Sequence, residues 1–338
     1  MYYQNGKPLV SIIISTYNRY ELAKGAIESA LQQSYKNIQI IVVEDGSRSQ
    51  LDKHITSVND ERIKYFLHNK NKGLAAVRNT GTFKAEGQYI CFMDDDDRWL
   101  PDKVKRQLSI IKKYEDQKCI VYCNTLRIRG DTLIPNQYNL FSGSMKPYIY
   151  NGYKLPQSSI MVSKQNLLNI AGNSEDLISC IDHDLWMKFA QNDFAMDFVN
   201  EGLIYHPIHN GLTMTRKLED RLLGIKQFFD KWKEIVINEY GRTAWKKIEK
   251  IYHIQTSNNV IKNYNNSLIN KNDALKYFKK LYYLQDTKYT ILDNYIVTKC
   301  LNNYDAGVYY TPVMSNIRKI IYGISTSPVK RIMDLSRK

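Results

Sequence analysis

Short apolar runs alternate with amphipathic segments through the first 125 residues, and this alternation limits the possible folds more than any other feature. The run LVSIIIS (9–15) is typical of a strand buried on both faces, and 21–34 repeat apolar residues at helical spacing. We expect further strands at 38–43, 62–68 and 89–93, with helices at 49–58, 73–85 and 101–115. The pattern predicts right-handed βαβ units, and therefore an α/β fold with a mainly parallel, Rossmann-like sheet covered by helices on both sides.

Polar clusters stand where three of the expected strands end. They are STYNR (15–19), EDGS (44–47) and DDDD (94–97). Because ligands of parallel sheets bind beyond the carboxyl ends of the strands, we expect the clusters to converge on one edge. The sequence has no GxGxxG after the first strand and no GxxxxGK[ST], so a bound phosphate would have to be neutralised without a glycine-rich loop.

The acidic run is either a solvated turn or a cation site, because neighbouring carboxylates repel one another until a proton or cation relieves them. Mg²⁺ and Mn²⁺ prefer oxygen ligands and bind through carboxylates together with substrate phosphates. The spacing of Asp94 and Asp96 lets one carboxylate face a nucleotide and the other a metal. Asp45 is placed to accept a hydrogen bond from a base N–H, and Arg78 brings a cation to the same edge.

Five segments in order resemble the family 2 glycosyltransferases with the GT-A fold, over roughly residues 8–213. The segments are VSIIISTYNR, IIVVEDGS, NKGLAAVRNTG, GQYICFMDDDDRWLPDK and DHDLWMK. The resemblance implies an inverting hexosyl transfer from a nucleoside diphosphate sugar, usually UDP-linked, with Mn²⁺ or Mg²⁺ as cofactor. It also implies a glycan acceptor, which we expect on a lipid diphosphate carrier, in the synthesis of bacterial surface polysaccharide such as O-antigen or capsule.

The same resemblance assigns roles to individual residues. It implies nucleotide contacts by Ser15, Tyr17, Asp45, Arg78, Asp94 and Asp95. Asp96 matches the metal ligand of the DxD motif, together with Asp94, and Asp182 matches the general base, with Asp184 behind it. His206 and His209 are spaced as HxxH, and we interpret them as structural histidines, while His209 stays a candidate contact to the diphosphate or the metal.

The charge is unevenly distributed. Lys and Arg number 48 against 34 Asp and Glu, a formal net charge of +14, and most of the excess lies within 211–338. We expect a catalytic domain at 1–215 and a basic helical extension at 216–338. Within 315–338, isoleucines share one helical face with cations around it, which predicts either a terminal helix packed on the catalytic domain or an anchor on an anionic membrane.

The cysteines and the apolar segments bear on location. Five cysteines, odd in number and without CxxC spacing, favour a reducing compartment. We find neither a signal peptide nor a run of ~18 apolar residues. We therefore expect a cytoplasmic protein, peripheral at the inner face of the cell membrane.

Two other functions are compatible with parts of the sequence. A nucleotidyltransferase shares the parallel sheet and the acidic metal site, but it normally carries a glycine-rich phosphate loop. A nucleic-acid-binding protein would use the basic tail, as the pI of about 9.3 allows. The basic residues lie apart from the acidic crevice, so we expect no nucleic-acid partner.

Overall fold

The chain forms two compact units, Met1–Tyr252 and His253–Lys338. The computed structural model describes residues 3–4, 6–47, 49–114, 117–129, 132–136, 140–150, 152–153, 155–207 and 218–284. The expected domain boundary after residue 215 and the 315–338 segment lie outside these residues, so both stay predictions.

The first part of the first unit has the expected order of strands and helices. Its elements are β1 (Tyr3–Gln4), β2 (Lys7–Pro8), β3 (Val10–Thr16), α1 (Tyr20–Leu31), β4 (Ile38–Glu44), α2 (Leu51–Val58), β5 (Ile63–Leu67), α3 (Leu74–Lys84), β6 (Tyr89–Asp94), β7 (Arg98–Trp99) and α4 (Lys103–Ile111). Every strand and helix expected between 9 and 115 is present, so this prediction is confirmed. We call residues 10–111 the parallel half.

The second part contains strands that the sequence did not reveal. Its elements are η1 (Lys112–Tyr114), β8 (Cys119–Arg129), β9 (Thr132–Pro135), β10 (Gly143–Ser144), α5 (Lys146–Ile149), η2 (Gln157–Ser159), β11 (Ile160–Ser163), α6 (Lys164–Asn169), α7 (Ile181–Gln191) and β12 (Ala195–Tyr205). We call residues 119–206 the mixed half, because its strands pair in both directions.

One ten-stranded sheet joins the two halves, in the order β10-β12-β8-β11-β6-β3-β4-β5, with β7 beside β12 and β9 beside β8. β3 pairs in parallel with β4 and β6, β4 with β5, and β8 with β12. β11 runs antiparallel to both β6 and β8 and so connects the halves. The prediction of a mainly parallel sheet is therefore confirmed.

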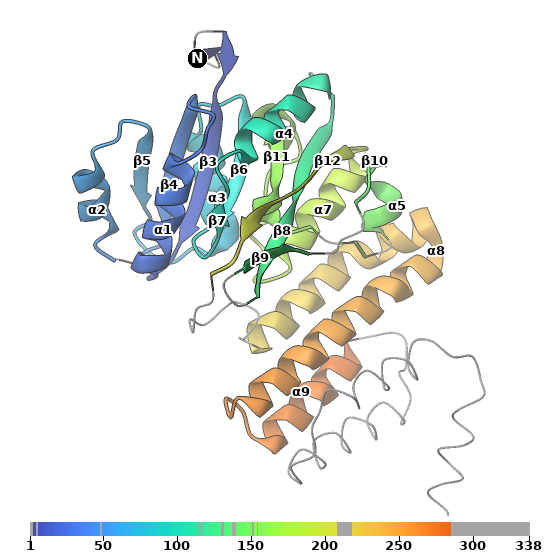
Figure 1. Cartoon of the computed structure of the whole chain (residues 1–338). Helices are drawn as coiled ribbons and strands as arrows, with labels where there is room; N and C mark the ends of the chain where they lie inside the picture. Colours follow the sequence, from blue (N-terminus) through green and yellow to red (C-terminus); the bar gives the residue numbers. More distant parts are fainter. Residues whose placement is uncertain are drawn as a thin grey trace, which may run out of the picture. The chain divides into compact units, whose positions relative to one another are not determined.

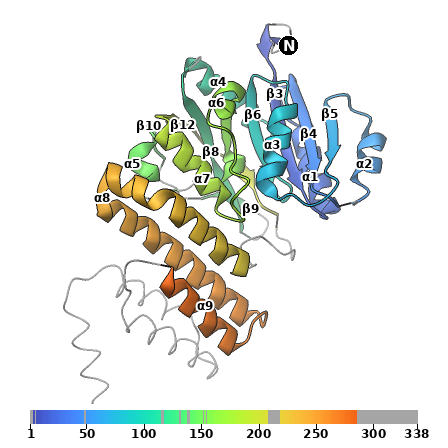
Figure 2. The same ribbon diagram turned by 180° about the vertical axis from the view of Figure 1, so that it is seen from behind.

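Helices cover both faces of this sheet. In the opposite views of Figures 1 and 2, α1 and α4 lie over one face, and α3 and α6 over the other. Val10, Ile12 and Ile14 are fully buried in a cluster with side chains of α1 and α4. On the other face a Cβ at Gly81 of α3 would lie 2.3 Å from Ile13 Cγ2, so only glycine lets the helix approach so closely. With both faces covered, an edge of the sheet is left for a site.

A long helix, α8 (Leu218–Asn265), follows, interrupted at Gly241, whose φ is 81°. Within the first unit, the Phe228 ring stacks on His183 of α7 with centroids 4.7 Å apart. In the second unit, α9 (Lys271–Tyr283) begins after Asn270, whose side chain accepts a hydrogen bond from the Asp273 N–H. Among the described residues, the helices are too short or too polar to cross a bilayer.

Candidate active site

The ends of β3, β4 and β6 lie side by side at one edge of the sheet. Ser15 is paired with Asp94, and Thr16 with Glu44, so the three polar clusters converge as expected. The Ser15 side chain is buried, and its hydroxyl has no hydrogen-bond partner among the described residues. Tyr17, just beyond the strand, is 51% exposed. A buried hydroxyl without a partner beside an exposed ring is suited to receiving a polar, flat ligand.

The four aspartates of the acidic run alternate between solvent and interior. A tight turn, closed by the Asp97 N–H on the Asp94 carbonyl at 3.0 Å, leaves the Asp94 and Asp96 side chains 37% and 22% exposed. Asp95 and Asp97 are buried. The outward carboxylates, Asp94 and Asp96, are thus the frame that we matched to the DxD motif, whereas the second frame of the same spacing, Asp95 and Asp97, points inward.

Asp95 is held by the parallel half. It accepts hydrogen bonds from the Thr16 hydroxyl at 2.9 Å and from Arg19 at 2.8 Å. Burial raises the pKa of Asp95 to about 7, because desolvation outweighs these two partners. The guanidinium of Arg19 also reaches Asp96 Oδ2 at 2.9 Å, so one arginine spans two carboxylates of the loop.

Asp97 is held by the mixed half. It forms an ion pair with His206 Nδ1, and this bond raises the pKa of His206. His206 follows the last residue of β12 and is half-exposed. The sequence contained the signal, the HxxH spacing, but our structural interpretation of His206 gave it no place beside the acidic loop.

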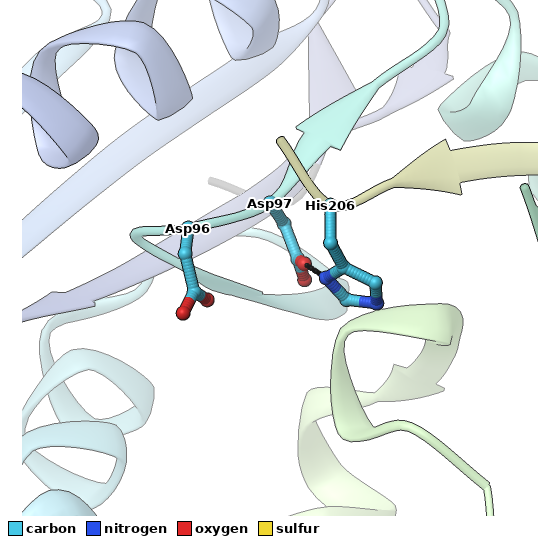
Figure 3. A group of neighbouring side chains, drawn as sticks. All are labelled: Asp96, Asp97 and His206. Carbon is cyan, nitrogen blue, oxygen red and sulfur yellow. Dashed lines mark ion pairs between the residues drawn. The ribbon is translucent and has the colours of Figure 1, made fainter. Parts of the chain in front are cut away.

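Asp96, Asp97 and His206 form a group that could hold a metal ion, since one ligand atom from each lies within 4.8 Å of the others (Figure 3). Two carboxylates, one partly exposed at Asp96, suit Mg²⁺ or Mn²⁺, which also bind phosphate oxygens and water. An imidazole favours a first-row transition metal, so this donor set fits Mn²⁺ better than Mg²⁺. Of the two predicted metal ligands, Asp96 belongs to this group. Asp94 lies outside it and accepts a hydrogen bond from Arg78. His209 lies outside the described residues.

Arg78 connects the two halves. Its buried guanidinium donates to Asp94 Oδ1 at 2.8 Å, to Asp182 Oδ1 at 2.7 Å and to the Gln157 side chain. Burial opposes the charge, but the two carboxylates outweigh it and raise the pKa of Arg78. The arginine that we expected at the edge is there, and its contacts in this structure are with these side chains.

The surroundings of Asp94 disfavour its charged form, whereas those of Arg78 favour the charged form. Desolvation raises the pKa of Asp94 to about 6, against the attraction of Arg78, and the nearby Asp97, Asp182 and Asp96 carboxylates add to the rise. The site therefore concentrates negative charge around one buried guanidinium. A cationic ligand or a metal would relieve this repulsion.

The two candidate bases at the start of α7 have different surroundings. Asp182 is 44% exposed and uses Oδ1 to bind Arg78. Asp184 is fully buried, and its oxygens bind Trp232 Nε1, the Ser174 hydroxyl and Lys231 at 2.6–2.8 Å. Asp184 therefore fastens α7 to α8, whereas Asp182 is open to the site.

Asp45 lies at the end of β4 and is also buried. Its carboxylate accepts the Lys72 and Gly73 N–H groups and faces His68 Nδ1, each at 2.8 Å. The preceding Glu44 accepts bonds from Ser47, Ser49 and Tyr65. These two carboxylates therefore hold Ser47, Ser49 and the 72–73 loop at this edge by hydrogen bonds within the protein.

Comparison with known proteins gives a consistent result. The family model Glycosyl transferase family 2 matches residues 11–171. An uncharacterized glycosyltransferase of Rickettsia prowazekii is 32% identical over 236 residues, 67% of this chain and 70% of that protein. The Escherichia coli protein WfaP, a UDP-Glc:alpha-D-GlcNAc-diphosphoundecaprenol beta-1,3-glucosyltransferase, is 29% identical over 63% of this chain and 82% of its own.

The solved structures place the fold. TarS residues 1–349 of Staphylococcus aureus, in complex with UDP, align with a TM-score of 0.59 and 16% identity, over 89% of this chain and 92% of that one. Such a likeness shows the fold, a mixed and mostly parallel sheet flanked by helices as in GT-A enzymes, and confirms the expected architecture.

Proposed function

The chain belongs to family 2 of the glycosyltransferases, and from this premise we propose that it transfers a sugar from a UDP-sugar, with inversion, to a glycan acceptor on a lipid diphosphate carrier. The pathway would be the synthesis of a bacterial surface polysaccharide. WfaP, by its name, uses UDP-glucose and a diphosphoundecaprenol acceptor, and a TarS structure contains UDP-GlcNAc, which supports both parts of the proposal.

The observation that carries the proposal is the double ion pair of Arg78. One guanidinium binds both Asp94, at the end of β6, and Asp182, at the start of α7. A donor on the strand ends and a base across from it is the arrangement that a single displacement requires.

Asp182 acts as the general base in this proposal. Its Oδ1 is held by Arg78, so the carboxylate keeps one orientation. Oδ2 takes the proton of the acceptor hydroxyl while the hydroxyl oxygen attacks the anomeric carbon and the bond from that carbon to the UDP oxygen breaks. One base on the face opposite the leaving diphosphate gives inversion. Asp96, Asp97 and His206 would hold a divalent cation, which supplies positive charge for the leaving UDP.

The donor nucleotide would lie on the strand ends. Ser15 and Tyr17 offer a hydroxyl and a ring, and Asp45 offers an acceptor for a base N–H. Asp94 would contact the donor beside Arg78. Asp95 already binds Thr16 and Arg19, so it would affect the nucleotide indirectly, by supporting the acidic loop.

A lipid-linked acceptor implies work at a membrane surface. The enzyme would then be peripheral at the inner leaflet, with the basic 315–338 segment as the candidate anchor. Co-sedimentation of the full chain with anionic liposomes, weakening as salt rises, would support this location. Equal binding to neutral liposomes would contradict it.

The test of the function is a panel of UDP-sugars incubated with the full chain and Mn²⁺. We expect slow release of UDP from at least one donor, faster with a polyprenyl diphosphate glycan, and loss of both reactions in EDTA. Formation of UTP and a sugar 1-phosphate when pyrophosphate is added in place of the glycan would indicate a nucleotidyltransferase. Undiminished turnover in EDTA would reject the metal, and a product of retained configuration would reject single displacement.

A further inference from the structure

A series of hydrogen bonds runs from Asp45 through His68 to Thr80, and neither His68 nor Thr80 has a place in the mechanism above. His68, the residue after β5, has Nδ1 2.8 Å from Asp45 Oδ1 and Nε2 3.0 Å from the Thr80 hydroxyl on α3. Asp45 and His68 are both buried. This series of hydrogen bonds thus joins the ends of two neighbouring strands to the helix that covers them.

The chemistry of the partners fixes the direction of these bonds. A carboxylate oxygen can only accept, so His68 Nδ1 carries a hydrogen and donates it to Asp45. In the neutral ring Nε2 is then an acceptor, and the Thr80 hydroxyl donates to it. Asp45 therefore sets the tautomer, and the Thr80 hydroxyl, which can donate or accept, holds the orientation of the ring.

The same bonds determine which oxygen of Asp45 can receive a ligand. Oδ1 accepts from both His68 and the Lys72 N–H, whereas Oδ2 accepts from the Gly73 N–H. A carboxylate offers about four acceptor positions, two on each oxygen. Within the described residues, Oδ1 is filled and Oδ2 keeps one position, and His68 acts together with the Lys72 and Gly73 N–H groups to hold the rotation of the carboxylate.

We propose that His68 and Thr80 are positioning residues that set the base preference of the donor site. This inference rests on the proposed function, in which Asp45 contacts the nucleotide base. The uracil ring presents an N–H at position 3, which the remaining Oδ2 position accepts. Cytosine presents a lone pair at the same place, which an oriented carboxylate repels, so a fixed Asp45 distinguishes UDP from CDP.

A purely structural role makes a different forecast. Asp45 also fastens the 70–73 loop, and Gly46 lies against it, since a Cβ there would come within 2.2 Å of the Lys70 carbonyl carbon. If His68 only supported this loop, its loss would weaken every nucleotide equally. Only a change in the ratio of UDP to CDP affinity reports the orientation of Asp45.

The experiment is calorimetric titration of the full chain with UDP and with CDP, in Mn²⁺. The variants are His68→Leu, which removes both bonds, His68→Asn, whose amide can donate from nearly the position of Nδ1, and Thr80→Val, which frees the ring. We expect His68→Leu to weaken UDP binding about tenfold and CDP binding less than twofold, the loss of one hydrogen bond. His68→Asn should stay within about threefold of wild type for UDP, and Thr80→Val should fall between.

The outcomes separate the inference from its premise. A wild-type chain that binds neither nucleotide refutes the proposed function. UDP binding without preference over CDP, or equal losses for both nucleotides in His68→Leu, overturns the inference alone. If His68→Leu does not fold, as circular dichroism would show, Thr80→Val decides, because an unchanged UDP to CDP ratio in that variant also overturns it.

Discussion

The parallel half and the mixed half contribute to the site in different ways. In the parallel half the polar side chains lie at or directly after the ends of β3, β4 and β6, and neighbours such as Thr16 and Arg19 hold them. In the mixed half they come from three unlike places: the 3₁₀ turn before β11, the first turn of α7 and the end of β12. The first half prepares a binding edge, and the second brings single groups to it.

The difference shows where the chemistry is vulnerable. A strand-end cluster is supported by backbone on both sides, so the loss of one contact leaves others. Asp182 and His206 are each tied to the opposite half by one ion pair, to Arg78 and to Asp97. We therefore expect changes in the mixed half or at its junction to affect turnover, and changes in the parallel half to affect stability and nucleotide binding.

The strongest test replaces Asp182 by Asn. The amide keeps the size of the side chain but cannot take a proton, so turnover should fall by about 10²–10⁴ while UDP affinity changes little. Stopped UDP-release assays and titration with UDP measure the two effects. An equal loss of UDP binding would place Asp182 in the donor site.

The matched control is Asp184→Asn, the same change two residues along. Asp184 is buried against Lys231 and Trp232, so the variant should lose about 1–3 kcal/mol of unfolding free energy with turnover per folded molecule nearly intact. Urea unfolding measures this. If Asp184→Asn instead lost turnover at full stability, the two aspartates would have to exchange roles.

In the parallel half, Gly46→Ala should cost stability. The residue has φ 75°, and an added Cβ would meet backbone atoms of Lys70 and Asn71 at 2.2–2.3 Å, so we expect a loss of about 2–4 kcal/mol. Gly6→Ala is the control, because Gly6 has a similar φ of 70° and open space around it, and should cost about 1 kcal/mol. Equal losses in the two variants would mean that the loop simply moves aside.

At the junction, Arg78→Lys keeps the charge but loses the fork that holds Asp94 and Asp182 together. We expect a roughly tenfold drop in kcat with a smaller change in UDP affinity, because the base loses its fixed orientation. Arg62→Lys is the control, an Arg–Asp pair with Asp60 near the surface, for which we expect no change in kcat. Unchanged kcat in Arg78→Lys would show that turnover does not require one guanidinium to bind both Asp94 and Asp182.

The smallest expected effect concerns Arg19, which reaches Asp96 from the parallel half. Arg19→Gln removes a cation that competes for a candidate metal ligand, so Mn²⁺ should bind about threefold more tightly without nucleotide. Electron paramagnetic resonance of free Mn²⁺ measures this without any turnover. Weaker binding would mean that Arg19 instead orients Asp96 for the metal.

Residues near one another in sequence account for what could be predicted. β3, β4 and β6 are strands of six or seven residues built around apolar runs of three to five, and their register alone aligns Ser15 with Asp94 and Thr16 with Glu44. β11 has only four residues, too few for a period to show, and its antiparallel place between β6 and β8 was not predicted.

The unpredicted parts of the site depend on long-range contacts. The two carboxylate partners of Arg78 lie 16 and 104 residues away, so the sequence indicated a cation at the edge but not what it binds. The alternation of exposed and buried aspartates in the acidic run likewise depends on Arg19 and His206, whose positions are set by the folded sheet. The local sequence pattern thus predicts where a strand ends, whereas tertiary packing determines which side chains the residues at that end contact.

The ion pair between Asp97 and His206 also bears on how the protein is made. Contacts that close long loops form late, because the entropy of the intervening chain must be lost first. During synthesis the strands of the parallel half leave the ribosome before residue 206 exists, so the nascent chain can assemble its nucleotide edge while the acidic loop still lacks its histidine. In the proposed mechanism, the growing polypeptide therefore stays catalytically silent until His206, just after the last strand of the sheet, has been translated.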